Sequence, residues 1–277
     1  MSASRENDDF RPALEACVAG DVDRARTLYN GLIESDPSCR MALLTQMAII
    51  SARKAHPAVL SFCFESGLTE RKFGCNDDIL YAACDASAIP IFAVLLDEGG
   101  LDVNHWLESV GDVLKAAVDH GNIELVKYLL SKGADPNSDR CAPHGDDIAI
   151  IGAIIGGRNQ QNTEMLKVLL EHGAKLEETG ALIAAAEHGK LEAVKLIFEM
   201  RGDQVDLEEE TEEGLMDPRV RDDDGTALYK AAAGGHGEVV DVLIRKGANI
   251  GFKDPSGRSV VDIARANGHQ NLAVRLG

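Results

Sequence analysis

The stretch from Thr226 to Asn249 is a unit that the rest of the chain repeats with variations. It reads TALYKAAAGGHGEVVDVLIRKGAN, two short apolar helical patterns separated by a glycine-rich turn at 234–237 and followed by Gly247. Neither predicted helix is long enough to bury its own apolar side, so a neighbouring unit must cover it. A chain of this kind is therefore constrained to stack pairs of helices.

Spacing along the chain locates the other units. An alanine four residues before a glycine recurs at Ala16/Gly20, Ala117/Gly121, Ala185/Gly189, Ala231/Gly235 and Ala264/Gly268. The steps between these glycines are 101, 68, 46 and 33 residues, which fit multiples of about 33 to 34 residues with one excess of about thirteen. Gly-Ala pairs at Gly133, Gly173 and Gly247 end second helices, because glycine accepts positive φ at low cost.

The best-preserved unit resembles the ankyrin repeat family. The resemblance is carried by TALY at 226–229 in place of the family's TPLH, by Ala231-Ala232 with Gly235-His236, by Glu-Val-Val at 238–240 and by Gly-Ala-Asn at 247–249. It covers nearly the whole chain, and between residues 40 and 105 it depends on helix pairs alone. The resemblance implies an all-α ankyrin-repeat solenoid of about eight helix-turn-helix repeats with hairpin-like loops.

We expect residues 9–277 to form one ankyrin-repeat domain after a polar tail at 1–8, with a capping repeat at about 255–277. The predicted helix pairs are Asp9–Glu34, Met41–Gly67, Asp77–Gly99, Asp112–Gly133, Ile148–Ile155 with Glu164–Leu170, Gly180–Phe198, Thr226–Asn249 and Ser259–Leu276. In the fifth pair, a polar bridge at 156–162 is expected to lie at the surface.

The excess of thirteen residues falls between Leu182 and Leu228. Eleven of the 22 residues from Asp203 to Asp224 are acidic and two are basic, so this insertion, at about 203–222, is expected to be a mobile, extended finger. The alternatives are a docking loop for a basic surface and a calcium loop at Asp222–Gly225. The calcium hypothesis is weak, because the alternating ligands and final glutamate of an EF-hand are missing. No metal site is predicted.

Composition limits the classes of partner and compartment. The net charge is −18 and no basic run occurs, so binding to nucleic acid or to an anionic membrane is not expected. No signal peptide begins the chain, and the longest apolar run, 148–155, is too short to cross a bilayer. Cys17 and Cys84 are expected to be buried thiols in a reducing compartment. We therefore expect an intracellular monomer, in the cytoplasm or alternatively the nucleus.

Sequence motifs for catalysis and cofactor binding are lacking, so no catalytic residue and no cofactor is predicted. His236 and His269 match the family's Gly-His, whose ring ordinarily hydrogen-bonds loop backbone. His120 and His188 each follow a carboxylate, Asp119 and Glu187, which raises the alternative of general-base chemistry. We prefer to interpret these residues as repeated surface residues without a catalytic role, because adjacent residues on a helix point in different directions.

The favoured function is a non-enzymatic scaffold that binds a partner protein through its concave groove and hairpin tips, as the resemblance implies. The exposed candidates for partner binding are Trp106, Asp119, His120, Glu187, His188, Tyr229, Lys253 and Arg258. Trp106 alternatively covers the edge of a neighbouring repeat, and Tyr229 alternatively has a structural role. The negative charge predicts a basic or polar partner whose binding weakens with salt. The alternative function is an enzyme or regulatory subunit with an unrecognised pocket.

Overall fold

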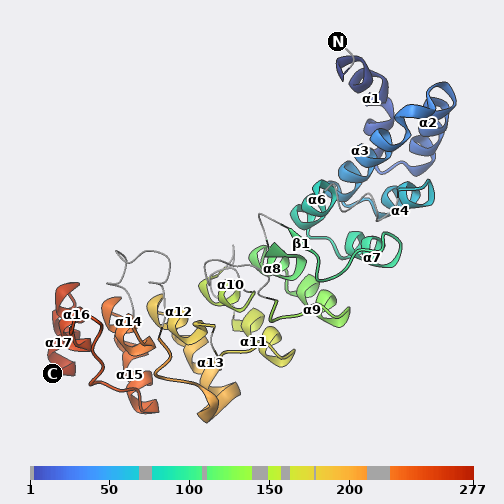
Figure 1. The fold of residues 1–277 in the computed structure, drawn as a ribbon. Coiled ribbons are helices and arrows are strands. Elements are labelled where there is room, and N and C mark those ends of the chain that lie inside the picture. Colours follow the sequence, from blue (N-terminus) through green and yellow to red (C-terminus); the bar gives the residue numbers. More distant parts are fainter. Residues whose placement is uncertain are drawn as a thin grey trace. The chain divides into compact units, whose positions relative to one another are not determined.

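The computed structural model describes residues 3–68, 77–107, 111–138, 149–156, 163–177, 179–210 and 225–277. Its regular structure is almost entirely helical, and short turns join the helices in pairs (Figure 1). Contacts within the chain group it into two compact units, Met1–Ala134 and Asp135–Gly277. The prediction of one domain at 9–277 stays a prediction, and each unit is described by itself.

The first unit contains four helix pairs and one short hairpin. Its elements are α1 (Ala3–Ala19), α2 (Val22–Ser35), the 3-10 helix η1 (Pro37–Cys39), α3 (Arg40–Arg53), α4 (Pro57–Glu65), α6 (Asp78–Ala86), α7 (Ile89–Asp97), β1 (Trp106–Leu107), β2 (Gly111–Asp112), α8 (Val113–Asp119) and α9 (Ile123–Ser131). First helices pack on the first helices of neighbouring pairs, so that α3 lies between α1 and α6. Second helices do the same, and α4 packs on α2 and α7.

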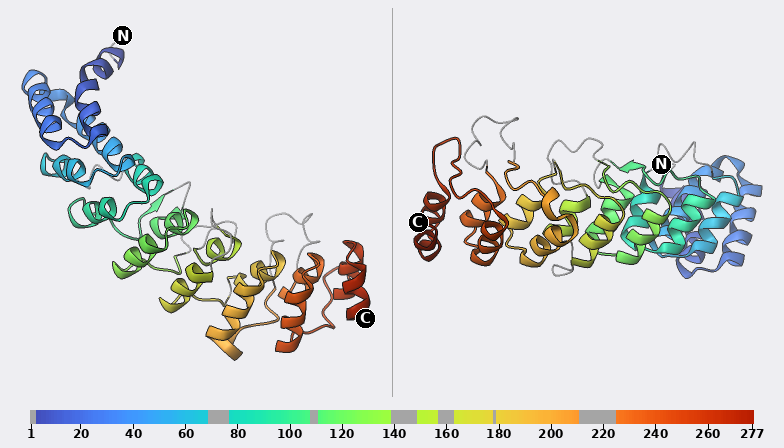
Figure 2. Two further views of the ribbon diagram at one scale, coloured as in Figure 1. Left: turned by 180° about the vertical axis from the view of Figure 1, so that it is seen from behind. Right: turned by 90° about the horizontal axis from the view of Figure 1, so that it is seen from below.

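The second unit contains four further pairs. Its elements are α10 (Ala149–Ile155), α11 (Thr163–Glu171), α12 (Ala181–Glu187), α13 (Leu191–Arg201), the 3-10 helix η3 (Gly202–Gln204), α14 (Ala227–Ala233), α15 (Gly237–Lys246), α16 (Val260–Ala266) and α17 (Gln270–Leu276). Here α12 packs between α10 and α14, α14 also contacts α16, and α13 packs between α11 and α15. The hairpin before α16 rises beyond the ends of the helices in the right-hand view of Figure 2.

Eight helix pairs within the described ranges confirm the predicted all-α stack of helix pairs. One boundary differs: α1 begins at Ala3, whereas the first predicted helix begins at about Asp9. Residues 3–8 contain neither glycine nor proline, so nothing in them ends the helix. The polar bridge expected at 156–162 lies outside the described residues except for Gly156, which has a φ of 91° directly after α10.

Caps at both ends explain why the repeated unit folds into two short helices. The Thr226 side chain accepts a hydrogen bond from the backbone of Tyr229 and begins α14. The turn to α15 passes through Gly235, whose φ is 72°. Gly247 ends α15 in the left-handed conformation, with a φ of 101°. Leu228 of the first helix and Leu243 of the second are fully buried.

The last pair differs from the others on one side. Asp262 and Arg265 lie three and six residues after the N-cap Ser259, where α14 has the buried residues Tyr229 and Ala232. Arg265 donates to the Asp262 carboxylate at 3.4 Å, and both side chains are more than half exposed. The side of α16 that corresponds to a buried side of α14 is therefore polar.

Candidate functional site

Three hairpins are closed by pairs at equivalent positions. Trp106 pairs with Asp112, Glu210 with Thr226, and Lys253 with Ser259, all antiparallel. The second member of each pair is the N-cap of the next first helix. The outgoing positions, Trp106, Glu210 and Lys253, are therefore equivalent, and each stands beside the start of a first helix. These pairs confirm the hairpin-like loops that the resemblance implied.

Chain lengths between the paired residues divide the excess of thirteen residues into two parts. Five residues separate Trp106 from Asp112 and Lys253 from Ser259, but fifteen separate Glu210 from Thr226. Ten of the thirteen excess residues therefore lie in the sequence between the paired residues Glu210 and Thr226. The other three precede it, because α13 and its exit segment are longer than α15 and its exit segment. Residues 211–224 lie outside the described residues, as does the calcium hypothesis at 222–224.

The first part of the acidic segment is not an extended finger. The N–H of Gly180 donates to Glu209 Oε1 at 2.8 Å, and the N–H of Asn249 donates to Glu208 Oε1 at 2.9 Å. Acidic composition predicted a solvated segment, but backbone N–H groups of two repeats bind these carboxylates. The expectation of an extended finger is therefore wrong at Glu208 and Glu209, and the mobility of the insertion stays a prediction.

Trp106 and Lys253 are accessible to different degrees. Trp106 is half-buried, and its ring lies beside Gly111, where an added Cβ would stand 3.6 Å from Cζ3. Lys253 is exposed at the base of its hairpin, not at the tip, because it pairs with Ser259. A partner-binding role for either residue stays a prediction.

Tyr229 is buried, with 2% of its surface exposed, so the expectation that it is exposed was wrong. Its hydroxyl donates to Asp254 Oδ2 at 2.6 Å. Arg258 also lies at the hairpin base and is half-buried, because its Nε and backbone N–H donate to the same carboxylate at 2.6 and 2.8 Å. Burial and the hydrogen bond to Asp254 raise the pKa of Tyr229 above its usual value. These residues build the hairpin rather than extend from it.

The histidine and the carboxylate of each predicted pair bind different groups. His120 Nδ1 lies 2.7 Å from the carbonyl of Ala116, while Asp119 accepts from Lys115 at 2.6 Å. His188 Nδ1 likewise lies 3.0 Å from the carbonyl of Ala184. Each ring thus donates to the last turn of its own helix, an arrangement that differs from a carboxylate-oriented general base.

Glu187 joins its repeat to the next one through two groups. Its carboxylate accepts from Lys230 Nζ at 3.4 Å, and its backbone carbonyl accepts from His236 Nε2 at 2.8 Å. The Lys230 side chain is only 8% exposed, so Glu187 compensates a largely buried charge. The Glu187 side chain is 46% exposed.

Joints of the same kind occur between other repeats. The predicted backbone bond of His269 is confirmed by its contact of 3.1 Å with the carbonyl of Ala233. Sequence reasoning missed His56, whose Nε2 lies 3.0 Å from the carbonyl of Val18, and Asn122, whose amide donates to Ser87 at 2.7 Å. The available signal for Asn122 was its place directly after Gly121, the position that His236 and His269 occupy after their glycines.

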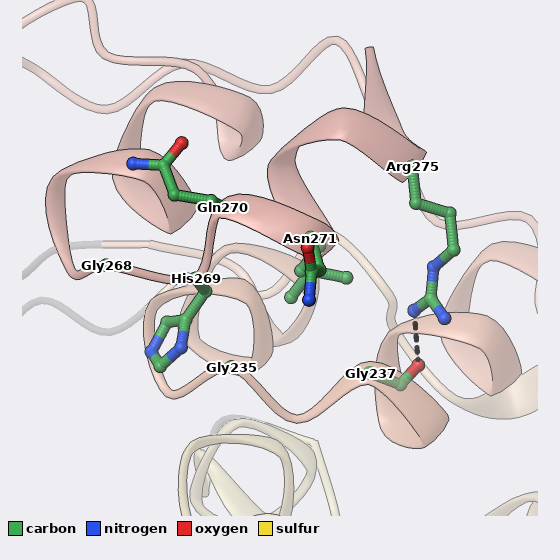
Figure 3. A pocket seen from close by; sticks show the side chains of 8 residues that line it. Gly235, Gly237, Gly268, His269, Gln270, Asn271 and Arg275 are labelled. Atoms are coloured by element: carbon green, nitrogen blue, oxygen red, sulfur yellow. Dashed lines mark hydrogen bonds between the residues drawn. The ribbon is translucent and has the colours of Figure 1, made fainter.

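A shallow cavity of about 430 Å³ lies between the first turns of α15 and α17 (Figure 3). Its titratable residues are His269 and Arg275, and each is bonded to a backbone carbonyl; Arg275 donates to Gly237 at 3.0 Å. The cavity therefore does not gather several ionisable groups around a reaction centre. Within the parts of the chain that the structure describes, no group of three or more His, Cys, Asp or Glu residues is placed to hold a metal ion.

Family models agree with this geometry. A model described as ankyrin repeats (3 copies) matches residues 47–140, and one described as ankyrin repeats (many copies) matches residues 182–244, together more than half of the chain. The chain belongs to the ankyrin repeat family. Ankyrin repeats are generally protein–protein interaction modules, and proteins of this family are typically not enzymes.

Curated ankyrin relatives are much longer than this chain. The ankyrin repeat and KH domain-containing protein mask-1 of Caenorhabditis elegans is 24% identical over 275 residues, which cover 95% of this chain and 10% of that protein. The transient receptor potential cation channel subfamily A member 1 of Homo sapiens is 29% identical over 182 residues, 62% of this chain and 14% of that protein. No helix within the described ranges is both long and apolar enough to cross a membrane.

Among solved structures, the ankyrin repeat domain of Bcl-3, a member of the IkappaB protein family, is similar with a TM-score of 0.54. The two chains are 19% identical, and the match covers 96% of each. This similarity shows the ankyrin solenoid fold, and at this identity it shows the fold alone.

Proposed function

We propose that this ankyrin-repeat chain is a non-enzymatic scaffold that binds a partner protein through its hairpins and the ends of its first helices. The observation that carries the proposal is the equivalent placement of Trp106, Glu210 and Lys253 beside the starts of first helices. Side chains of different character at one repeated position let each repeat make a different contact, and such differences distinguish partners.

The proposed contact residues are the candidates predicted from the sequence that remain accessible in the structure. They are Trp106, Asp119, His120, Glu187, His188 and Lys253. Tyr229 and Arg258 contribute indirectly, by holding the hairpin that carries Lys253. Aromatic residues such as Trp106 commonly supply much of the contact energy of an interface.

The charge of the chain supports a basic or polar partner. With a net charge of −18, the surface attracts cationic proteins and repels the phosphates of nucleic acids and anionic membranes. We expect the affinity for the partner to fall by about tenfold between ~50 and ~500 mM salt, because exposed charges are screened. An affinity that is equal at both salt concentrations would remove the electrostatic part of the proposal.

A location inside the cell, in the cytoplasm or nucleus, and a monomeric state belong to the same proposal. Four cysteines in the described residues, Cys17, Cys39, Cys63 and Cys84, are free thiols, which fits a reducing compartment. Size-exclusion chromatography with light scattering tests the monomer, and imaging of a tagged chain tests the compartment.

The function is tested by affinity capture with matched variants. The contact variant combines Trp106→Ala, His188→Ala and Lys253→Ala. The control combines Lys167→Ala, Lys195→Ala and Arg245→Ala, three exposed residues on the second helices α11, α13 and α15. We expect the control to retain the proteins captured by the wild type and the contact variant to lose them, at equal melting temperatures. Equal capture by both variants would contradict the proposed surface.

A further inference from the structure

Exit loops in this chain bind the exit loop of the following repeat through one side chain. Asn137 Oδ1 accepts from the N–H of Lys175 at 2.7 Å, and its amide donates to the carbonyl of Gly173 at 3.0 Å. In the first unit, Asn104 donates to the carbonyl of Gly133 at 3.3 Å. An asparagine suits this place because one amide both donates and accepts.

Glu208 stands at the same place in the sixth repeat. It lies seven residues after the end of α13, as Asn104 lies seven residues after the end of α7. Its Oε1 accepts from the N–H of Asn249, which stands two residues after Gly247 as Lys175 stands two residues after Gly173. A carboxylate therefore replaces the asparagine, accepting a charge-assisted hydrogen bond but donating none.

The adjacent residue binds in a different direction. Glu209 Oε1 accepts from the N–H of Gly180, the N-cap of α12, at 2.8 Å. Two neighbouring carboxylates thus hold the start of the sixth repeat and the exit of the seventh. They do so directly before Glu210, where the hairpin with the fifteen-residue span begins.

We propose that Glu208 and Glu209 form a strap that fixes the base of this long hairpin and keeps the sixth and seventh repeats in register. Closing the fifteen residues of chain between Glu210 and Thr226 costs more entropy than closing the five residues between the members of the other two pairs. The strap compensates by anchoring the outgoing limb at two backbone N–H groups. Losing the carboxylates opens these contacts locally while the helices remain folded.

Amide hydrogen exchange in the full-length chain, followed by NMR, tests the strap. We expect Glu209→Ala to speed exchange of the Gly180 amide by about tenfold, and Glu208→Ala to do the same for Asn249, because each change removes the acceptor. The matched control is Glu210→Ala, which removes an exposed carboxylate from the same segment and should leave both amides unchanged.

A rescue variant separates the strap from a general effect of charge. Glu208→Asn places the residue of the Asn137 joint in the sixth repeat, so it should restore slow exchange at Asn249 without restoring the charge. Wild-type exchange rates at both amides in the Glu208→Ala/Glu209→Ala variant would overturn the proposal. So would loss of the helical circular dichroism of that variant, since the strap acts locally.

Discussion

The hydroxyl of Tyr229 and the carboxylate of Asp254 are joined by a hydrogen bond of 2.6 Å, which ties a first helix to the hairpin that leads into the next repeat. Arg258 donates to the same carboxylate at 2.6 Å, so three side chains fix this hairpin from the inside. The exposed Lys253 directly precedes Asp254 and is positioned by this arrangement.

Tyr229→Phe should therefore destabilise the second unit without creating a cavity. The variant keeps the buried ring and loses the hydrogen bond to Asp254, and we expect the free energy of unfolding to fall by about 1 to 2 kcal/mol. Urea denaturation of both proteins measures the difference. An unchanged midpoint would show that the bond contributes nothing net to stability.

Stability should depend on pH through Asp254. Burial raises the pKa of this carboxyl, but the hydrogen bonds from Tyr229 and Arg258 outweigh burial and lower the pKa below its ordinary value. Because the folded pKa is below the unfolded value of about 3.9, the stabilisation is fully present above that value and is lost as the pH falls through the lower folded pKa. The stability gap between wild type and Asp254→Asn should therefore shrink below about pH 4. A constant gap from pH 7 to pH 2 would contradict this assignment.

Gly235→Ala tests the joint between the last two repeats. Gly235 has a φ of 72°, and an added Cβ would overlap the ring of His269, whose Nε2 contacts Ala233. We expect a loss of about 2 kcal/mol or more from backbone strain and the broken joint. Gly31→Ala, inside α2 with nothing within 4 Å of the added Cβ, is the matched control and should be neutral or stabilising. Equal melting temperatures for the two variants would exclude the steric account.

Thiol reactivity should follow burial. Burial raises the pKa of Cys17 to about 11 and, with the nearby charges of Asp85 and Asp112, raises that of Cys84 to about 12. Cys39 is half-exposed. At pH 8, iodoacetamide should modify Cys39 well before Cys17 and Cys84, and all three should react in denaturant. Mass spectrometry of the native protein resolves the order, and simultaneous modification would contradict the described packing.

Helix pairs were predictable because each repeat carries its own local signals. In the unit at 226–249, Thr226 caps the first helix and Gly247 ends the second, as local sequence indicates. The burial of Cys17 and Cys84 was also predicted and is confirmed. Small apolar residues on the inner face of a first helix can be predicted to be buried without knowing which residues they contact.

Side-chain partners across repeats could not be predicted in the same way. The hydroxyl of Tyr229 binds Asp254, which lies 25 residues later in the sequence. The carboxylate of Glu187 binds Lys230, which lies 43 residues later. Glu208 and Glu209 have the composition of a solvated segment, and only the fold brings the N–H groups of Asn249 and Gly180 to them. The packing of one repeat on another sets these contacts, and that packing cannot be read from any one repeat.

Hydrogen exchange of the chain alone and in complex with its captured partner tests the scaffold proposal most directly. Binding is expected to protect the hairpin segments 103–107 and 249–259 and the first-helix ends around 119–120 and 187–188, while the exposed faces of α9, α13 and α15 exchange as before. Protection confined to those second helices, with the hairpins unchanged, would contradict the proposal.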